Sequence, residues 1–118
     1  MSRDWRLYAD DIIEYGRHVQ QFTEGVTFES FVSDDKTQLA VLRCLEIIGE
    51  AVKQMPPAEL AQHPDVPWRR VARFRDRVAH GYFGIKLEIV WEIIHDHLPH
   101  LLAAVERSLG THQADDAP

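Results

Sequence analysis

The sequence predicts an all-α fold, a bundle of four main helices joined by short helical turns. Apolar residues recur at spacings of three and four along most of the chain, and no segment shows the apolar and polar alternation of a strand. The 118 residues are enough for one domain with a single core. We therefore expect one domain over residues 1–109 and a disordered tail over residues 110–118, which has nothing to bury.

The first helix is predicted to begin at a cap formed by Ser2 or Asp4 and to end at Gly25, which follows Thr23 and Glu24. A short helical element of one or two turns follows over residues 27–32. The apolar seam of the first helix consists of Trp5, Tyr8, Ile12, Tyr15, Val19 and Phe22.

A second long helix opens at Asp34 or Asp35, and Pro56 and Pro57 end it, because proline cannot donate the helical hydrogen bond. Its apolar face is wide enough for a central helix with neighbours on several sides. The loop that follows, AELAQHPDVP, has room for one helical turn. The face of the long helix consists of Leu39, Val41, Leu42, Leu45, Ile48, Val52 and Met55.

Pro67 suits the first turn of a third helix, which we expect to run to about His80, where Gly81 breaks it. This helix should turn Trp68, Val71, Phe74 and Val78 inward and its arginines outward. The last helix begins near Lys86, and Pro99 must kink or split it near Leu98. Its apolar side consists of Leu87, Val90, Trp91, Ile94, Leu98, Leu101 and Val105.

Arginine is concentrated in one short stretch of an acidic chain. The formal net charge is −6, yet five of the 13 positive residues lie between residues 69 and 77. This distribution favours a small anion site over a broad nucleic-acid-binding face. No apolar run approaches the roughly 20 residues needed to cross a bilayer. The charged N-terminus lacks the apolar stretch of a signal peptide, and Cys44, the only cysteine, excludes an internal disulfide, so we expect a reducing cytoplasm.

The segment RFRDRVAHGYFG holds the candidate chemistry, with Arg75, then His80 five positions later, then Tyr82. Five helical positions amount to a rotation of about 500°, so Arg75 and His80 lie about 140° apart on a regular helix. They converge only if the helix ends at Gly81, if the long arginine side chain reaches around, or if two such helices meet across a two-fold axis.

Together with its neighbouring segments, this motif resembles the HepT-like toxins of the HEPN superfamily. The resemblance spans nearly the whole chain, through SRDWRLYADDI, LRCLEIIGEAVKQ, VPWRRVARFRDRVAHGYFGI and IVWEII. Members of that family carry Arg, four residues, His, one residue and Tyr, which Arg75, His80 and Tyr82 match. Asp76 matches too, because a polar residue usually follows the motif arginine.

The resemblance implies a HEPN-type bundle and a metal-independent ribonuclease that acts as the toxin of a bacterial or archaeal toxin–antitoxin pair. Its implied partners are RNA, a second copy of the chain and a minimal nucleotidyltransferase antitoxin, with no cofactor, metal or membrane. The antitoxin would silence the toxin by transferring AMP to Tyr82.

The chemistry suits these side chains, because RNA supplies its own nucleophile, the 2′-hydroxyl. An imidazole exchanges protons near neutral pH, so His80 is the candidate acid or base. Arg75 is the candidate for stabilising charge on the phosphate. Asp76 is a candidate supporting residue that orients an arginine or the histidine, and Arg73 and Arg77 are candidates for steering phosphate.

Simpler interpretations stay open for several of these residues. Arg69, Arg73 and Arg77, four apart, also fit an exposed, solvated stripe, and His80 also fits a helix C-cap, where the helix dipole favours a cation. Glu46 and Glu50 either face the arginines or form an ordinary polar stripe.

The histidines around Pro99 suggest a zinc site, but His95 and His97 diverge on a helix, which leaves at most His97 and His100 on one side. We therefore expect no metal there. For the whole chain, the alternatives to a ribonuclease are a non-catalytic nucleotide- or protein-binding HEPN module and a purely structural helical dimer.

Overall fold

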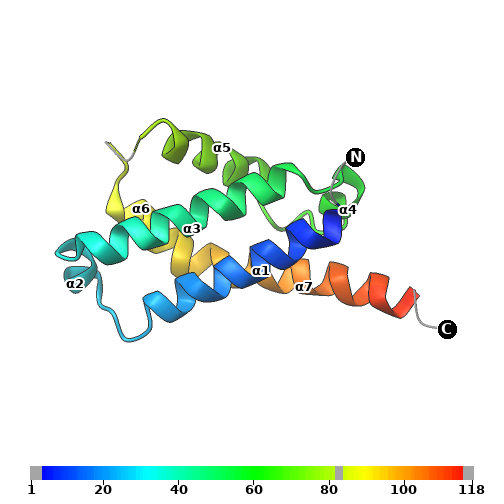
Figure 1. Ribbon diagram of the computed structural model, residues 1–118, viewed down its shortest axis with the longest axis horizontal. Helices are drawn as coiled ribbons and strands as arrows, with labels where there is room; N and C mark the ends of the chain where they lie inside the picture. Colours follow the sequence, from blue (N-terminus) through cyan, green and yellow to red (C-terminus); the bar gives the residue numbers. More distant parts are fainter. Residues whose placement is uncertain (1–3, 82–83, 116–118) are drawn as a thin grey trace.

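The structure is a computed structural model that describes residues 4–81 and 84–115 (Figure 1). Within these ranges there is no strand, so the predicted all-α fold is confirmed. The elements in chain order are α1 (Trp5–Phe22), α2 (Phe28–Val32), α3 (Asp35–Lys53), α4 (Pro57–Ala61), α5 (Trp68–Ala79), α6 (Leu87–Glu92), the π-helical segment η1 (Ile93–His97) and α7 (Leu98–Asp115).

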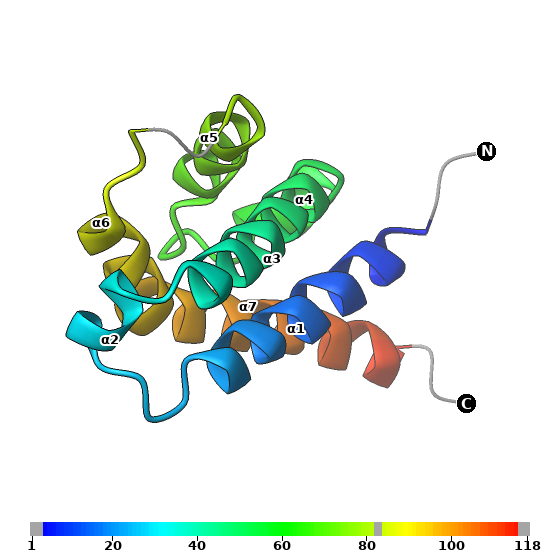
Figure 2. The same ribbon diagram turned by 60° about the vertical axis from the view of Figure 1, so that its left-hand side comes forward.

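Helix α3 is the central helix of the bundle, as its wide apolar face predicts. It packs against α1 on one side and α5 on another, and α1 also packs against α7 (Figures 1 and 2). Helix α5 is an outer helix, and Val78 is its only fully buried residue. The largest fully buried apolar side chains are Phe31, Ile12, Ile48, Val19, Val41, Val52, Val90 and Val105.

Polar side chains cap the first three helices. The Asp4 carboxylate accepts a hydrogen bond from the Arg6 N–H at 2.9 Å, whereas Ser2, the other predicted cap, lies outside the described residues. Thr27 caps α2 in a capping box. Asp34 accepts from the Thr37 hydroxyl at 2.6 Å and from its N–H at 3.1 Å, and these bonds lower the pKa of Asp34.

Two residues assigned to apolar faces from their spacing are exposed. Phe22 is 41% exposed at the end of α1 and stacks on His18, and Leu39 is 50% exposed near the start of α3. Spacing identifies the side of a helix that faces the core, but it does not show where the neighbouring helix stops covering that side.

Pro99 interrupts the last helix, as predicted. It has no N–H to donate to the carbonyl one α-helical turn earlier, and the turn before it is π-helical, with the Leu98 N–H donating to the Ile93 carbonyl. Helix α7 then continues to Asp115, past Gly110, where the sequence predicts the end of the folded domain. Residues 116–118 of the predicted tail lie outside the described residues.

Candidate active site

Helix α5 presents different arginines to different surroundings. Its apolar residues recur every three or four positions, and they direct one side of the helix toward α3. Arg69, Arg70, Arg73 and Arg77 are exposed, as predicted. Arg75 differs from them, because it lies on the side that packs against α3 and its side chain is only 30% exposed.

Gly49 lets Arg75 approach the central helix. A Cβ atom at Gly49 would overlap the Cβ of Arg75 and lie 3.2 Å from the Val71 carbonyl oxygen, so α5 packs on the bare backbone of α3 at this point. One residue further along α3, Glu50 Oε2 lies 2.9 Å from Arg75 Nε. Of the two glutamates weighed from the sequence, Glu50 therefore faces the arginine, whereas Glu46 pairs with Arg43 of its own helix at 2.9 Å.

Asp76 links the two helices through its carboxylate. Its Oδ1 accepts a hydrogen bond from Lys53 Nζ at 2.7 Å and another from Arg75 Nη1 at 3.3 Å. The bond from Lys53, followed by the charges of Lys53 and Arg75, lowers the pKa of Asp76. Lys53 is not among the site residues predicted from the sequence. The available signal is its position three residues after Glu50 on α3, which places both residues on one side of that helix.

His80 is held by the main chain of Asp76. It is the C-cap of α5, and its Nδ1 lies 2.6 Å from the Asp76 carbonyl oxygen. A carbonyl oxygen only accepts hydrogen bonds, so Nδ1 must carry the proton. In the neutral imidazole, Nε2 is therefore the free acceptor, and the exposed ring presents it to solvent.

On one chain, Arg75 and His80 take different partners. Arg75 is engaged by Glu50 and Asp76 toward α3, and no hydrogen bond or ion pair among the described residues joins it to His80. This agrees with the separation of about 140° expected from helical geometry. Tyr82, the candidate modification site, lies outside the described residues.

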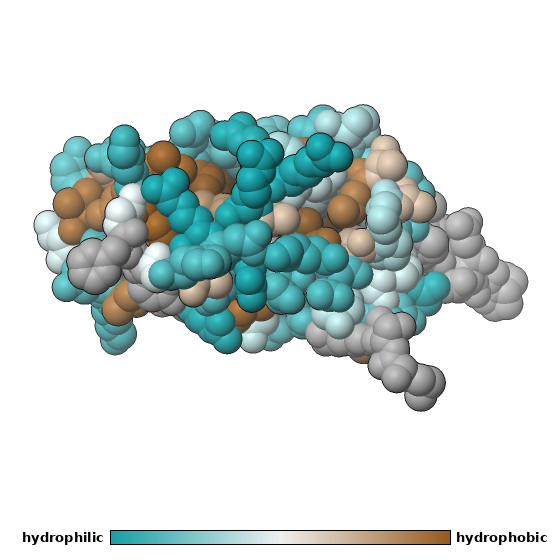
Figure 3. Space-filling model, turned by 90° about the horizontal axis from the view of Figure 1, so that it is seen from above, coloured by the Kyte–Doolittle hydropathy of each residue, from teal (hydrophilic) through white to brown (hydrophobic). Residues whose placement is uncertain are grey.

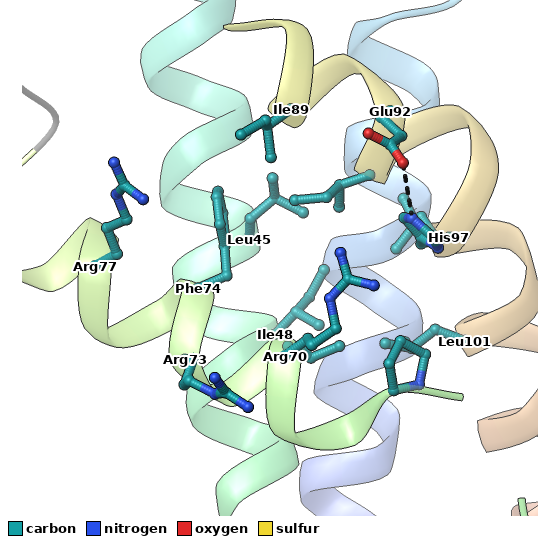
Figure 4. Close-up of a pocket in the computed structure, with 14 residues that line it drawn as sticks. Leu45, Ile48, Arg70, Arg73, Phe74, Arg77, Ile89, Glu92, His97 and Leu101 are labelled. Carbon is teal, nitrogen blue, oxygen red and sulfur yellow. Dashed lines mark ion pairs between the residues drawn. The ribbon is translucent and has the colours of Figure 1, made fainter. Parts of the chain in front are cut away.

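Arg73 and Arg77, but not Arg75, line an apolar groove (Figure 4). We name it the α5–α6 groove. Its floor comes from α3, one wall is α5 and the other is the segment formed by α6 and η1, and its volume is about 280 Å³. Arg77 Nη2 donates to the Gly84 carbonyl oxygen at 3.2 Å, which leaves its charge without a carboxylate partner among the described residues.

The C-terminal histidines make other contacts. His95 packs against Trp91 with ring centroids 4.3 Å apart, and His97 Nε2 lies 3.5 Å from Glu92 Oε1. In the part of the chain that the structure describes, no group of three or more histidine, cysteine, aspartate or glutamate side chains is arranged to hold a metal ion. Over the same residues, no helix combines the length and apolar character that spanning a bilayer requires.

Comparison with known proteins places these features in a family. The family model described as "Ribonuclease HepT-like" matches residues 12–108. A protein of Methanocaldococcus jannaschii named "Putative RNase MJ0127" is 40% identical over 115 residues, which cover 98% of this chain and 95% of that protein. A protein of Thermococcus cleftensis named "Probable ribonuclease HepT" is 41% identical over 107 residues, which cover 91% of this chain and 97% of that protein.

A third relative comes from Caldanaerobacter subterraneus and is named "Putative RNase TTE0752". It is 38% identical over 104 residues, which cover 88% of this chain and 93% of that protein. No solved structure matches the chain significantly. The family match covers α5, which carries Arg75 and Asp76, and most of the bundle. The relatives match over nearly their full length. The chain therefore belongs to the HepT-like ribonuclease family.

Proposed function

We propose that this protein is an endoribonuclease toxin that cleaves RNA without a metal ion, acts as a homodimer and is silenced by a nucleotidyltransferase antitoxin. The observation that carries the proposal is the fixed imidazole of His80, whose Nδ1 is bound to the Asp76 carbonyl oxygen at 2.6 Å. This bond leaves Nε2 free as a proton acceptor at the protein surface. Membership of the HepT-like ribonuclease family supports RNA as the substrate.

The reaction needs one proton acceptor and one group that stabilises negative charge. His80 Nε2 takes the proton of a 2′-hydroxyl, the 2′ oxygen attacks the adjacent phosphorus, and the bond from phosphorus to the 5′ oxygen breaks. A protonated imidazole returns a proton to the leaving 5′ oxygen. The products are a 2′,3′-cyclic phosphate and a 5′-hydroxyl. Arg75 stabilises the charge that develops on the phosphate oxygens.

The dimer supplies the convergence that one chain lacks. Arg75 and His80 lie on different sides of α5. When two α5 helices face each other across a two-fold axis, a phosphate bound by Arg75 of one subunit lies close to His80 of the partner subunit. Each site then contains Arg75 of one subunit and His80 of its partner. Asp76 supports both, since its carboxylate binds Arg75 and its carbonyl oxygen binds His80.

Silencing acts through Tyr82, two residues after His80. The antitoxin transfers AMP from ATP to the tyrosine hydroxyl and releases pyrophosphate. The added group is bulky and anionic, so it occupies the phosphate site and neutralises the arginines. Mass spectrometry of the toxin after incubation with antitoxin and ATP should show one added AMP on Tyr82, and Tyr82→Phe should stay unmodified and active. Silencing of Tyr82→Phe to the same extent as the wild type would contradict this step.

Cleavage is tested first with labelled RNA in EDTA, comparing wild type with His80→Ala and with His95→Ala as a matched histidine control. We expect fragments with cyclic phosphate 3′ ends from wild type and His95→Ala only. Full activity in His80→Ala would refute the catalytic assignment. RNA binding without cleavage by folded, unmodified wild type would favour the non-catalytic module instead.

The shared site is tested by mixing two inactive variants, Arg75→Ala and His80→Ala. If each site draws Arg75 from one subunit and His80 from the other, subunit exchange should restore about a quarter of wild-type activity, because half the dimers are mixed and each mixed dimer has one complete site. If both residues of a site come from one chain, the mixture stays inactive and the shared site is refuted.

A further inference from the structure

The α5–α6 groove combines an apolar floor with arginines on one wall. Its floor and walls include the aliphatic side chains of Leu45, Ile48 and Ile89 and the ring of Phe74 (Figure 4). Ile89 is 43% exposed, so the groove is open to solvent. Figure 3, which looks onto the α5 side of the molecule, shows apolar surface between hydrophilic side chains.

Arginines of α5 line one wall of the groove. Arg70 and Arg73 form no ion pair among the described residues, whereas Arg17, Arg43 and Arg75 each have a carboxylate at 3.0 Å or less. In a chain with a net charge of −6, arginines of this kind beside an apolar surface fit a ligand that joins a flat apolar body to an anionic group.

The opposite wall carries the Glu92 carboxylate, which can accept hydrogen bonds. The π turn of η1 places His97 beside Glu92, with Nε2 3.5 Å from Oε1, and both residues line the groove. The Glu92 carboxylate keeps lone pairs free to accept from an amino group, as carboxylates do with the exocyclic amine of cytosine. Uracil has no such amine.

The groove also lies in line with His80. His80 lies seven helical positions after Arg73, which corresponds to a rotation of about 700° and a rise of about 10 Å. Because about 700° is about 20° short of two full turns, Arg73 and His80 project from nearly the same side of α5. An RNA strand with its reacting phosphate at His80 therefore meets Arg77 and then Arg73 as it runs along the groove.

We infer that the α5–α6 groove binds one unpaired nucleotide of the RNA, next to the cleavage position, and prefers a base that carries an amino group. This inference rests on the proposed ribonuclease function. The base lies on the apolar floor against Phe74, as bases stack on aromatic side chains in single-stranded RNA recognition. Arg70 and Arg73 bind its phosphate, and Glu92 accepts from its amino group.

Binding is measured by fluorescence anisotropy with 2′-O-methyl oligonucleotides of adenine, cytosine or uracil, which cannot be cleaved because the nucleophile is blocked. We expect the adenine and cytosine strands to bind about tenfold tighter than the uracil strand, and Glu92→Gln to reduce that preference. Arg70→Ala should weaken binding about fivefold or more, whereas Arg17→Ala, an equal charge loss on α1, should change it less than about twofold.

Cleavage of unmodified RNA by the same variants separates this inference from the proposed function. His80→Ala should lose cleavage and keep binding. If wild type cleaves RNA but Arg70→Ala and Arg17→Ala bind alike, the groove assignment fails and the ribonuclease stands. If wild type never cleaves yet Arg70→Ala loses binding, the ribonuclease fails and the groove stands. If Ile89→Asp converts a dimer into a monomer in sedimentation while RNA binding is unchanged, a second copy occupies the groove and the inference is overturned.

Discussion

The contact between Gly49 and Arg75 predicts the effect of a single methyl group. Gly49→Ala adds a Cβ atom that would overlap the Arg75 Cβ and lie 3.1 Å from its Cγ. Both the Arg75 Cβ and the nearby Val71 carbonyl oxygen belong to the rigid part of α5, so neither can rotate out of the way. The substitution must therefore push α5 away from α3.

The size of the effect follows from two opposing terms. Alanine is favoured over glycine in a helix interior by about 1 kcal/mol. Against this, carbon atoms need about 3.5–4.0 Å between them, so the helices must separate by on the order of 1 Å, and overpacking of this kind costs about 1–3 kcal/mol. We expect a net loss of up to about 2 kcal/mol of unfolding free energy, a shift in Tm of several degrees.

The effect on cleavage should be larger than the effect on stability. Moving α5 by about 1 Å displaces Arg75 from Glu50, and misplacement of that size costs on the order of a hundredfold in rate. Urea denaturation and cleavage of labelled RNA, both at a temperature where the variant stays folded, measure the two effects separately.

Gly110→Ala is the matched control, because a Cβ atom there meets nothing within 4 Å. It should keep full activity and gain a few tenths of a kcal/mol, up to about 1 kcal/mol. If Gly49→Ala matched this control in stability and activity, α5 would not pack on α3 as closely as described, and the positioning of Arg75 by Gly49 would be wrong.

Three further perturbations probe other parts of the molecule. Trp68→Phe removes an indole N–H that donates to the backbone carbonyl oxygens of Leu60 in α4 and of His63, at 2.9 and 3.0 Å. Urea denaturation should therefore show a loss of about 1–3 kcal/mol of unfolding free energy, and no loss would contradict those bonds. The hydrogen bond from Lys53 is the main cause that lowers the pKa of Asp76, so the pair stabilises the fold above the unfolded pKa of about 3.8 and loses that effect as the pH falls through the lower folded value. When unfolding is followed during acid titration, Asp76→Asn should lose stability less steeply below pH 4 than wild type does. Identical unfolding curves for the two proteins would refute the link between Lys53 and Asp76. Burial raises the pKa of the Cys44 thiol, so a thiol reagent should modify Cys44 slowly in the native protein and rapidly in urea. Equally fast labelling of the native protein would show that the core around Cys44 is accessible to solvent.

Local rules in the sequence were enough to predict most of the helices. The spacing of apolar residues, the aspartate caps and the two prolines after residue 55 gave the bounds of α1 and α3 to within a few residues, because helix formation depends on neighbours three and four positions apart. The same rules located α5 between Pro67 and Gly81, which has a φ of 122° that favours glycine. The interruption before Pro99 also followed from the chemistry of one residue.

What the sequence by itself determined is the set of side chains available for chemistry and their positions along α5. It placed Arg75 and His80 on different sides of one helix, and it marked Asp76 as their neighbour. Through its resemblance to the HepT-like family it also indicated the family, which the comparisons confirm.

Only the tertiary structure decided which partner each of those side chains takes. Gly49 and Glu50 receive Arg75, and Lys53 receives the Asp76 carboxylate, because α3 and α5 cross where α3 has no side chain to hold them apart. The α5–α6 groove likewise depends on how three separate segments meet. Such contacts join residues more than 20 positions apart in the chain, and no local periodicity encodes which helix faces will touch or how closely.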